Sequence, residues 1–168
     1  MAMTTSKLAE TYQQKTDIEH ILDAPDTYIG SIESDRVKNW TLNDENSMNF
    51  TEYSWIGGLY KVFDEGIVNC RDHVVRLKQK LLNKEPNVIP VREIEISVDK
   101  QTGVITMYNT GNGVDVAKHP ENKLWIPEMI FGHLRTSTNY DKSEKKIVGG
   151  KNGFGFKLVL IWSTWGKI

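Results

Sequence analysis

One segment of the chain, "GLYKVFDEGIVNCRDHVVRLKQ", carries acidic and amide side chains at helical spacing. Glu65, Asn69 and Asp72 lie at i, i+4 and i+7, which places them on one face of a helix. A carboxylate such as Glu65 can orient or deprotonate a water, and the Asn69 amide oxygen is a hard ligand that suits Mg²⁺. Periodicity alone favours a plain solvated face. Valines rather than further charges border this face, which favours a half-buried site.

A second segment, "YNTGNGV", places an amide and two glycines directly after an expected strand. Asn109 offers both a donor and an acceptor, and Gly111 and Gly113 permit close approach of the backbone to a flat ligand. The alternative is a glycine-rich turn after a hairpin strand. The residues alone leave both interpretations open.

The third segment, "KKIVGGKNGFGFKLVLIWS", has four glycines in seven positions before an apolar run. It does not match a Walker loop, because Lys157 follows Phe156 rather than a glycine and has no hydroxyl residue after it. It does not supply a dinucleotide-binding fingerprint either. A loop that feeds a helix N-terminus beside Lys151 and Lys157 is a general anion site, and a closely packed helix cap is the alternative.

The elements that must position these segments follow from periodicity and from turn residues. We expect a long helix from Ile56 to about Pro86, a hairpin of "VREIEISVD" and "VITMYN", a short helix opened by Pro127, and a final helix ending near Trp162. Residues 135–153, "RTSTNYDKSEKKIVGGKNG", form a long polar and glycine-rich loop of the kind that often binds or covers a ligand. Before Pro25 the helical spacing is weak, and "APDTYIGSIE" predicts a turn that enters a short strand. One apolar stripe of the long helix is expected to face the core: Leu59, Phe63, Ile67, Cys70, Val74, Leu77 and Leu81.

Composition sets the class of protein. The chain has 168 residues, is 39% hydrophobic and carries 21 basic against 22 acidic residues, so we expect one globular domain with no overall attraction to DNA or to a membrane surface. A single cysteine excludes an intrachain disulfide, and neither a signal peptide nor a membrane-spanning run is present. These features indicate an intracellular protein.

Together and in this order, the three segments resemble the N, G1 and G2 boxes of the GHKL (Bergerat-fold) ATPases, the superfamily of type II topoisomerases, Hsp90, MutL and sensor histidine kinases. Four longer blocks are similar to the ATPase region of eukaryotic-type and viral type IIA DNA topoisomerases: "YQQKTDIEHILDAPDTYIGSIE", "GLYKVFDEGIVNCRD", "WIPEMIFGHLRTSTNYD" and "KKIVGGKNGFGFKL". The resemblance covers about residues 12–165.

The resemblance implies ATP and Mg²⁺ as cofactors and assigns roles by position. Glu65 would be the general base, Asn69 would hold Mg²⁺, and Asn109 would recognise adenine. Tyr12 would reach across a dimer to the partner's nucleotide. Other positions would line or wrap the nucleotide: Asp72, Gly111, Gly113, Val114, Ile130, Phe131, Ser137, Thr138, Asn139, Lys151, Asn152, Gly153, Phe154, Gly155 and Lys157.

The resemblance also implies an α/β two-layer sandwich, with a mixed, mainly antiparallel sheet and helices on one face. Residues 1–25 would form an N-terminal arm, and residues 26–168 a truncated ATPase domain that lacks the transducer and the DNA cleavage core. In the intact enzyme this domain would dimerise on binding ATP and act on double-stranded DNA, in a nucleus or in the host cytoplasm or virion of a virus. The alternatives are an ATPase of the Hsp90 or MutL kind and a nucleotide-binding dimerisation module without turnover.

Three positions depart from the usual pattern of that family, and a fourth is unexpected for its place in a helix. Lys151 replaces an arginine, Phe154 a tyrosine, and Thr110 an asparagine or aspartate. Because lysine lacks the bidentate fork of arginine, we expect a weaker grip on phosphate. Gly66 lies in mid-helix, where we expect it to loosen the turn that carries Glu65.

Overall fold

The computed structural model describes residues 11–12, 14–136 and 153–168, and Ser137, Thr138, Asn139, Lys151 and Asn152 lie outside them. The chain divides into two compact units, the first up to Leu59 and the second from Tyr60 onward. The first unit contains α2 (Asp17–Asp23), α3 (Pro25–Tyr28), β1 (Asp35–Leu42) and β2 (Met48–Trp55). In the part of the chain that the structure describes, no helix is long and apolar enough to cross a membrane.

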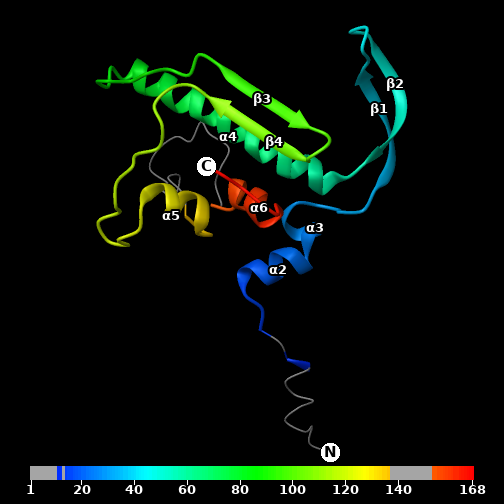
Figure 1. Cartoon of the computed structure of the whole chain (residues 1–168), viewed down its shortest axis with the longest axis horizontal. Helices are drawn as coiled ribbons and strands as arrows, with labels where there is room; N and C mark the ends of the chain where they lie inside the picture. Colours follow the sequence, from blue (N-terminus) through cyan, green and yellow to red (C-terminus); the bar gives the residue numbers. More distant parts are fainter. Residues whose placement is uncertain (1–10, 13, 137–152) are drawn as a thin grey trace, which may run out of the picture. The chain divides into compact units, whose positions relative to one another are not determined.

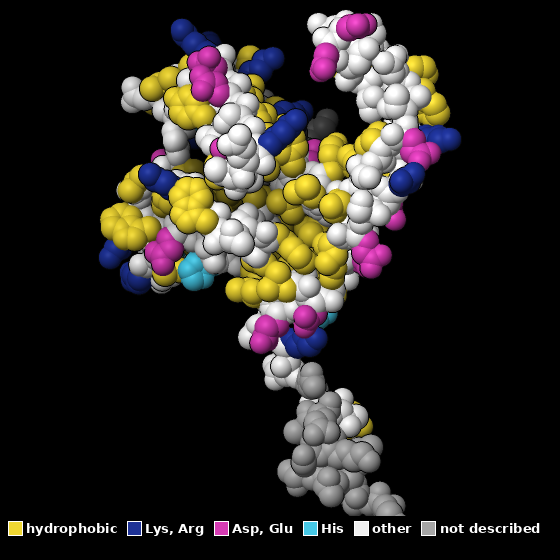
Figure 2. All heavy atoms as spheres, turned by 45° about the vertical axis from the view of Figure 1, so that its right-hand side comes forward, with side chains coloured by type: hydrophobic (Ala, Val, Ile, Leu, Met, Phe, Trp, Pro, Cys, Tyr) yellow, Lys and Arg dark blue, Asp and Glu magenta, His cyan; other side chains and the backbone are white. Residues whose placement is uncertain are grey.

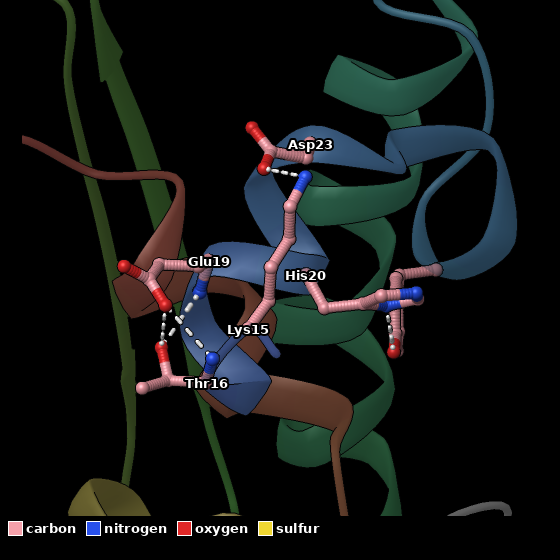
Figure 3. Close-up of polar contacts among 6 residues, drawn as sticks. Lys15, Thr16, Glu19, His20 and Asp23 are labelled. Atoms are coloured by element: carbon pink, nitrogen blue, oxygen red, sulfur yellow. Dashed lines mark hydrogen bonds and ion pairs between the residues drawn. The ribbon is translucent and has the colours of Figure 1, made fainter. Parts of the chain in front are cut away.

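The first turn of α2 is closed by a reciprocal pair of hydrogen bonds (Figure 3). The Glu19 amide donates to Thr16 Oγ1 at 3.3 Å, and the Thr16 amide donates to Glu19 Oε2 at 2.8 Å. Hydrogen bonds from the backbone and the side chain of Thr16 lower the pKa of Glu19. This capping box satisfies two amides that a helix start otherwise leaves without partners, and so explains why a helix forms in a segment of weak periodicity.

Strands β1 and β2 form an antiparallel hairpin. Its turn is held by Asn43, whose side-chain oxygen accepts from the amides of Glu45 at 3.1 Å and Ser47 at 2.8 Å. Trp40 pairs with Phe50 across the strands, with ring centroids 5.5 Å apart. Apolar side chains lie along this hairpin, which is at the upper right of Figure 2. Four of them are more than half exposed: Trp40, Leu42, Met48 and Phe50.

Sequence reasoning misplaced the elements around this hairpin. It predicted a turn and a short strand after Pro25, whereas residues Pro25–Tyr28 form α3 and the next strand begins only at Asp35. Proline at the first helical position, where its missing amide needs no partner, explains the helix. The pair β1 and β2 was not predicted at all, because neither strand alternates clearly between apolar and polar residues.

The second unit consists of α4 (Gly57–Leu82, which begins in the first unit), β3 (Ile94–Asp99), β4 (Val104–Asn109), α5 (Ile126–Gly132) and α6 (Gly155–Ile161) (Figure 1). These elements confirm the long helix, the hairpin and both short helices predicted from the sequence. The long helix ends at Leu82, a turn before Pro86.

The α/β class and the antiparallel pairing are confirmed. Strands β3 and β4 form one two-stranded sheet, and β1 and β2 form another. Among the described residues all strand pairs are antiparallel, so the parallel component of the expected mixed sheet is not seen there. Helix α4 runs beside β3 and β4 in Figure 1.

Close packing joins α4 to the β3–β4 hairpin. A Cβ atom on Gly66 would collide with Met107 Sδ and would lie 2.9 Å from Met107 Cε. Met107 is paired with Ile96 in the register, so both side chains lie on the hairpin face that looks toward α4. Helix α4 continues unbroken through Gly66. The glycine therefore has a packing role that the sequence did not reveal, namely to make room for Met107.

The predicted apolar stripe of α4 is buried only at its centre. Cys70 and Leu77 are buried, whereas Leu59 and Leu81 at the two ends are 59% and 43% exposed. Helices α5 and α6 pack through Phe131 and Phe156, whose rings meet edge to face at 5.7 Å. The core of the second unit thus lies around the middle of α4, which is where the polar face carries Glu65 and Asn69.

Candidate functional site

The polar face of α4 is not a plain solvated face. The Glu65 side chain is only 17% exposed, and its Oε1 lies 2.5 Å from Lys61 Nζ. Asn69 Nδ2 donates to the Glu65 backbone carbonyl at 2.6 Å. Only Oδ1 of this amide can bind a cation, and the bond from Nδ2 to the Glu65 carbonyl fixes the orientation of the amide. Hydrogen bonding and attraction to Glu65 also raise the pKa of Lys61.

The start of α6 lies against this pair. A Cβ atom on Gly155 would be 3.0 Å from Glu65 Oε2 and 4.0 Å from Asn69 Nδ2. Any larger residue would therefore push against the Glu65 carboxylate. Gly153, with φ +68°, introduces the turn that leads into α6. The structure brings the first and third sequence segments together at this point.

The second segment continues from β4 along α4. Asn109 lies two residues beyond Met107 and therefore on the same face of the strand, toward α4. Its Nδ2 donates to the Thr110 carbonyl at 2.9 Å, which leaves Oδ1 as the acceptor for a ligand. Gly111 then contacts α4 at Leu77, so Asn109 lies between two contacts with the helix, at Gly66 and at Leu77.

Thr110, which departs from the family pattern, fastens the loop. Its hydroxyl accepts from the amides of Arg92 at 2.9 Å and Glu93 at 3.1 Å, and its own amide donates to the Glu93 carbonyl at 3.1 Å. Threonine at this position thus still provides an oxygen that accepts hydrogen bonds from the backbone amides before β3. The sequence showed Thr110 only as a departure from the family pattern and gave no role for it.

The two glycines of this loop differ. Gly111 has φ +105°, and a Cβ there would lie 2.8 Å from Leu77 Cδ1, so its lack of a side chain is required by the fold. Gly113 has no described heavy atom within 4 Å of such a Cβ. Among the described residues no packing contact requires a glycine at Gly113, and its expected place beside a nucleotide stays a prediction.

His73 also belongs to this region and was missed from the sequence. Its Nε2 lies 2.6 Å from the Asn112 carbonyl oxygen, 39 residues further along the chain. Burial is the main cause that lowers the pKa of His73; the hydrogen bond to Asn112 opposes it, and the charges of Arg76 and Lys80 add to the lowering. Its position one helical turn after Asn69 was the available signal.

Asp72 and Lys157 are the buried charged residues of the site. Asp72 is 4% exposed, and its Oδ1 lies 3.1 Å from Arg71 Nη1. Lys157 is 6% exposed and donates from Nζ to the carbonyls of Thr136 and Gly153, both at 2.7 Å. Burial lowers the pKa of Lys157. In this structure the lysine holds two backbone carbonyls, and its expected contact with phosphate stays a prediction.

Five further predicted residues lie among those that the structure describes. Val114 is 39% exposed, and Ile130 and Phe131 are half-buried on α5. Phe154 is the residue that precedes α6, and Tyr12 is 75% exposed in the other unit. No group of three or more His, Cys, Asp or Glu residues able to hold a metal ion occurs among the described residues.

Taken together, the fold and the site define an α/β domain of the GHKL type. No model of a known protein family matches the chain. The ATPase region of Saccharomyces cerevisiae topoisomerase II superposes with a TM-score of 0.80 at 39% identity, covering 93% of this chain and 39% of that one. The ATPase and transducer domains of Balamuthia mandrillaris DNA topoisomerase II give 0.78 at 42% identity, covering 92% and 37%.

Curated sequences agree with the structural matches. DNA topoisomerase 2 of Acanthamoeba polyphaga mimivirus is 47% identical over 162 residues, and that of Candida albicans is 42% identical over 157 residues. The chain belongs to the type II DNA topoisomerase family and corresponds to part of its ATPase region. The match covers 94% of this chain but only 12% of the mimivirus protein. For the Candida albicans protein the corresponding shares are 93% and 10%.

Proposed function

We propose that this chain binds ATP together with Mg²⁺ and forms part of the ATP-operated gate of a type II DNA topoisomerase. The observation that carries the proposal is the closeness of Gly155, at the start of α6, to two side chains of α4: a Cβ at Gly155 would lie 3.0 Å from Glu65 Oε2 and 4.0 Å from Asn69 Nδ2. A carboxylate, an amide side chain and the start of a helix thus lie close together, which suits a triphosphate, a cation and an attacking water.

The residues present fit a magnesium ion. Asn69 Oδ1 is the hard oxygen that the amide leaves available, since Nδ2 bonds to the Glu65 carbonyl. A single protein ligand is typical of Mg²⁺, which otherwise binds water and phosphate oxygens. Held by Asn69, such an ion would neutralise part of the phosphate charge.

Glu65 is proposed as the general base. Oε1 of Glu65 forms an ion pair with Lys61, and Oε2 of Glu65 lies beside Gly155. The carboxylate therefore has a fixed orientation. Asn109 Oδ1 is proposed to accept from the amino group of adenine, because its Nδ2 bonds to the backbone. The outlying residues would complete the pocket: Ser137, Thr138, Asn139, Lys151, Asn152, Gly153, Phe154, Lys157, Val114, Ile130, Phe131 and Asp72.

The proposal extends to the enzyme as a whole. Two such domains would dimerise when ATP binds, with the arm of residues 1–25 and its exposed Tyr12 reaching the partner's nucleotide. The remainder of the enzyme would act on double-stranded DNA. We also propose an intracellular location, in a nucleus or in the host cytoplasm or virion of a virus. Membership of the topoisomerase family argues against an Hsp90 or MutL type of ATPase.

Replacement of Glu65 separates this function from a binding module without turnover. We expect Glu65→Gln to change the affinity for a non-hydrolysable ATP analogue by no more than about threefold, because the amide keeps the shape of the side chain. Phosphate release from ATP by the complete enzyme should fall at least 100-fold, in the range typical of a lost general base. Unchanged phosphate release would show that Glu65 is not the base.

A further inference from the structure

His73 joins the helix that carries Glu65 and Asn69 to the loop that follows Asn109. Its Nε2 lies 2.6 Å from the Asn112 carbonyl oxygen, and the side chain is half-buried. A carbonyl oxygen only accepts, so Nε2 must carry the proton of this bond. The imidazole is thus fixed in one tautomer when neutral, with its Nε2 directed at the loop.

The loop residue that His73 holds is itself fixed to a second segment. Asn112 Oδ1 accepts from the Ile89 amide at 2.5 Å, its Nδ2 donates to the Asn87 carbonyl at 3.2 Å, and its amide donates to the Ile89 carbonyl at 3.2 Å. Asn112 therefore moves together with the segment before β3. The bond from His73 is a polar link between that assembly and α4.

The apolar contact beside this link does not fix the loop in the same way. Gly111 packs on Leu77, one turn after His73 on α4, and such packing sets a separation without setting a direction. A hydrogen bond of 2.6 Å restricts sliding of the loop along the helix as well. His73 therefore adds a directional restraint on the position of Asn109 relative to Asn69, beside the packing of Met107 and Gly111 on α4.

We propose that His73 is a positioning residue that fixes the base-recognising loop against the phosphate-binding face of α4, and that it thereby sets the affinity and the base selectivity for nucleotide. This inference rests on the proposed function. The side chain itself touches no nucleotide in the proposal. It acts through the Asn112 carbonyl, three residues after Asn109.

The test compares His73→Leu with His73→Gln. Glutamine places an amide NH₂ close to the position of Nε2, so it can keep the hydrogen bond without the ring, whereas leucine cannot. The probes are non-hydrolysable analogues of ATP and GTP and inorganic tripolyphosphate, each titrated calorimetrically with Mg²⁺ into folded protein. Tripolyphosphate has no base and reports on the phosphate face alone.

We expect His73→Leu to bind the ATP analogue roughly three- to tenfold more weakly, the effect of one lost hydrogen bond, and to lose most of its preference for ATP over GTP. Its affinity for tripolyphosphate should stay within about twofold of the wild type. His73→Gln should restore both the affinity for the ATP analogue and the preference.

Equal affinity of His73→Leu and wild type for the ATP analogue overturns the inference while leaving the proposed function intact. So does a parallel loss of tripolyphosphate affinity that His73→Gln does not restore, since that pattern indicates a general structural role. Wild-type protein that binds no nucleotide overturns both proposals. If His73→Leu does not fold, nitrogen NMR of the wild-type ring decides, because a neutral imidazole protonated on Nδ1 contradicts the bond.

Discussion

The two glycines after Asn109 give the sharpest prediction, because the structure assigns them different reasons. A Cβ on Gly111 would lie 2.8 Å from Leu77 Cδ1 and 3.2 Å from the Ile89 carbonyl oxygen. Leu77 is 4% exposed, so it has no solvent-filled space into which to turn. Gly111 also has φ +105°, where residues with a Cβ are strained. Gly113 has neither constraint.

The expected loss of stability in Gly111→Ala follows from the backbone strain and from the collision with Leu77. Backbone strain of this kind costs about 1–3 kcal/mol and overpacking a core costs a similar amount. Because relaxation relieves part of both, we expect Gly111→Ala to lower the free energy of unfolding by roughly 2–4 kcal/mol. That corresponds to a melting temperature lower by about 5–15 °C for a chain of this size. Gly113→Ala should keep wild-type stability or gain up to about 1 kcal/mol.

Urea unfolding followed by circular dichroism measures both changes, and a calorimetric titration with an ATP analogue complements it. We expect Gly113→Ala to bind the analogue more weakly although its fold is intact, since a methyl group there would hinder the proposed approach of the nucleotide. Gly111→Ala with wild-type stability would refute the packing argument. Gly113→Ala as unstable as Gly111→Ala would refute the distinction between the two glycines.

Further predictions concern packing, pH and helix capping. Gly66→Ala should destabilise the wild type by about 1–2 kcal/mol, because the new methyl group would collide with Met107, but should stabilise a Met107→Ala background by about 0.5–1 kcal/mol. Free energies of unfolding of the two single variants and the double variant measure this. If the sign of the effect is the same in both backgrounds, the packing of Met107 on Gly66 is contradicted. Burial lowers the folded-state pKa of His73, so the unfolded chain takes up the proton first. Stability should therefore fall as the pH drops below about 6.5 and on through the folded value, and urea midpoints measured at several pH values should show a smaller fall in His73→Gln. Thr16→Ala should cost about 1 kcal/mol through the lost cap of α2, whereas Thr16→Ser should be nearly neutral in thermal unfolding.

The parts of the fold that could be predicted have a strong local signal. Helix α4 and the β3–β4 hairpin were predicted because periods of 3.6 and 2 persist through their sequences and Gly103 closes the turn. The hairpin of β1 and β2 was missed because its exposed faces mix aromatic and polar residues. Its turn residue Asn43, which binds two amides, was the signal that remained.

The site could be predicted as three segments but not as an assembly. Glu65 and Asn69 follow from helical spacing, and their contact with Gly155 joins residues about 90 positions apart in the sequence. The reason for Gly66 lies at Met107, and the partner of His73 is 39 residues away. Such pairs leave no periodic pattern in a single sequence, so only the folded chain reveals them.

The most direct test of the central claim is a calorimetric titration of a non-hydrolysable ATP analogue into this chain, with and without Mg²⁺, beside Asn69→Ala. Asn69→Ala removes the one amide oxygen assigned to the cation and also the bond from Nδ2 to the Glu65 carbonyl. We expect wild-type binding that strengthens with Mg²⁺, and in the variant a weaker binding that Mg²⁺ no longer improves. Folded wild-type protein that binds no analogue, or a variant whose response to Mg²⁺ equals that of the wild type, would contradict the account.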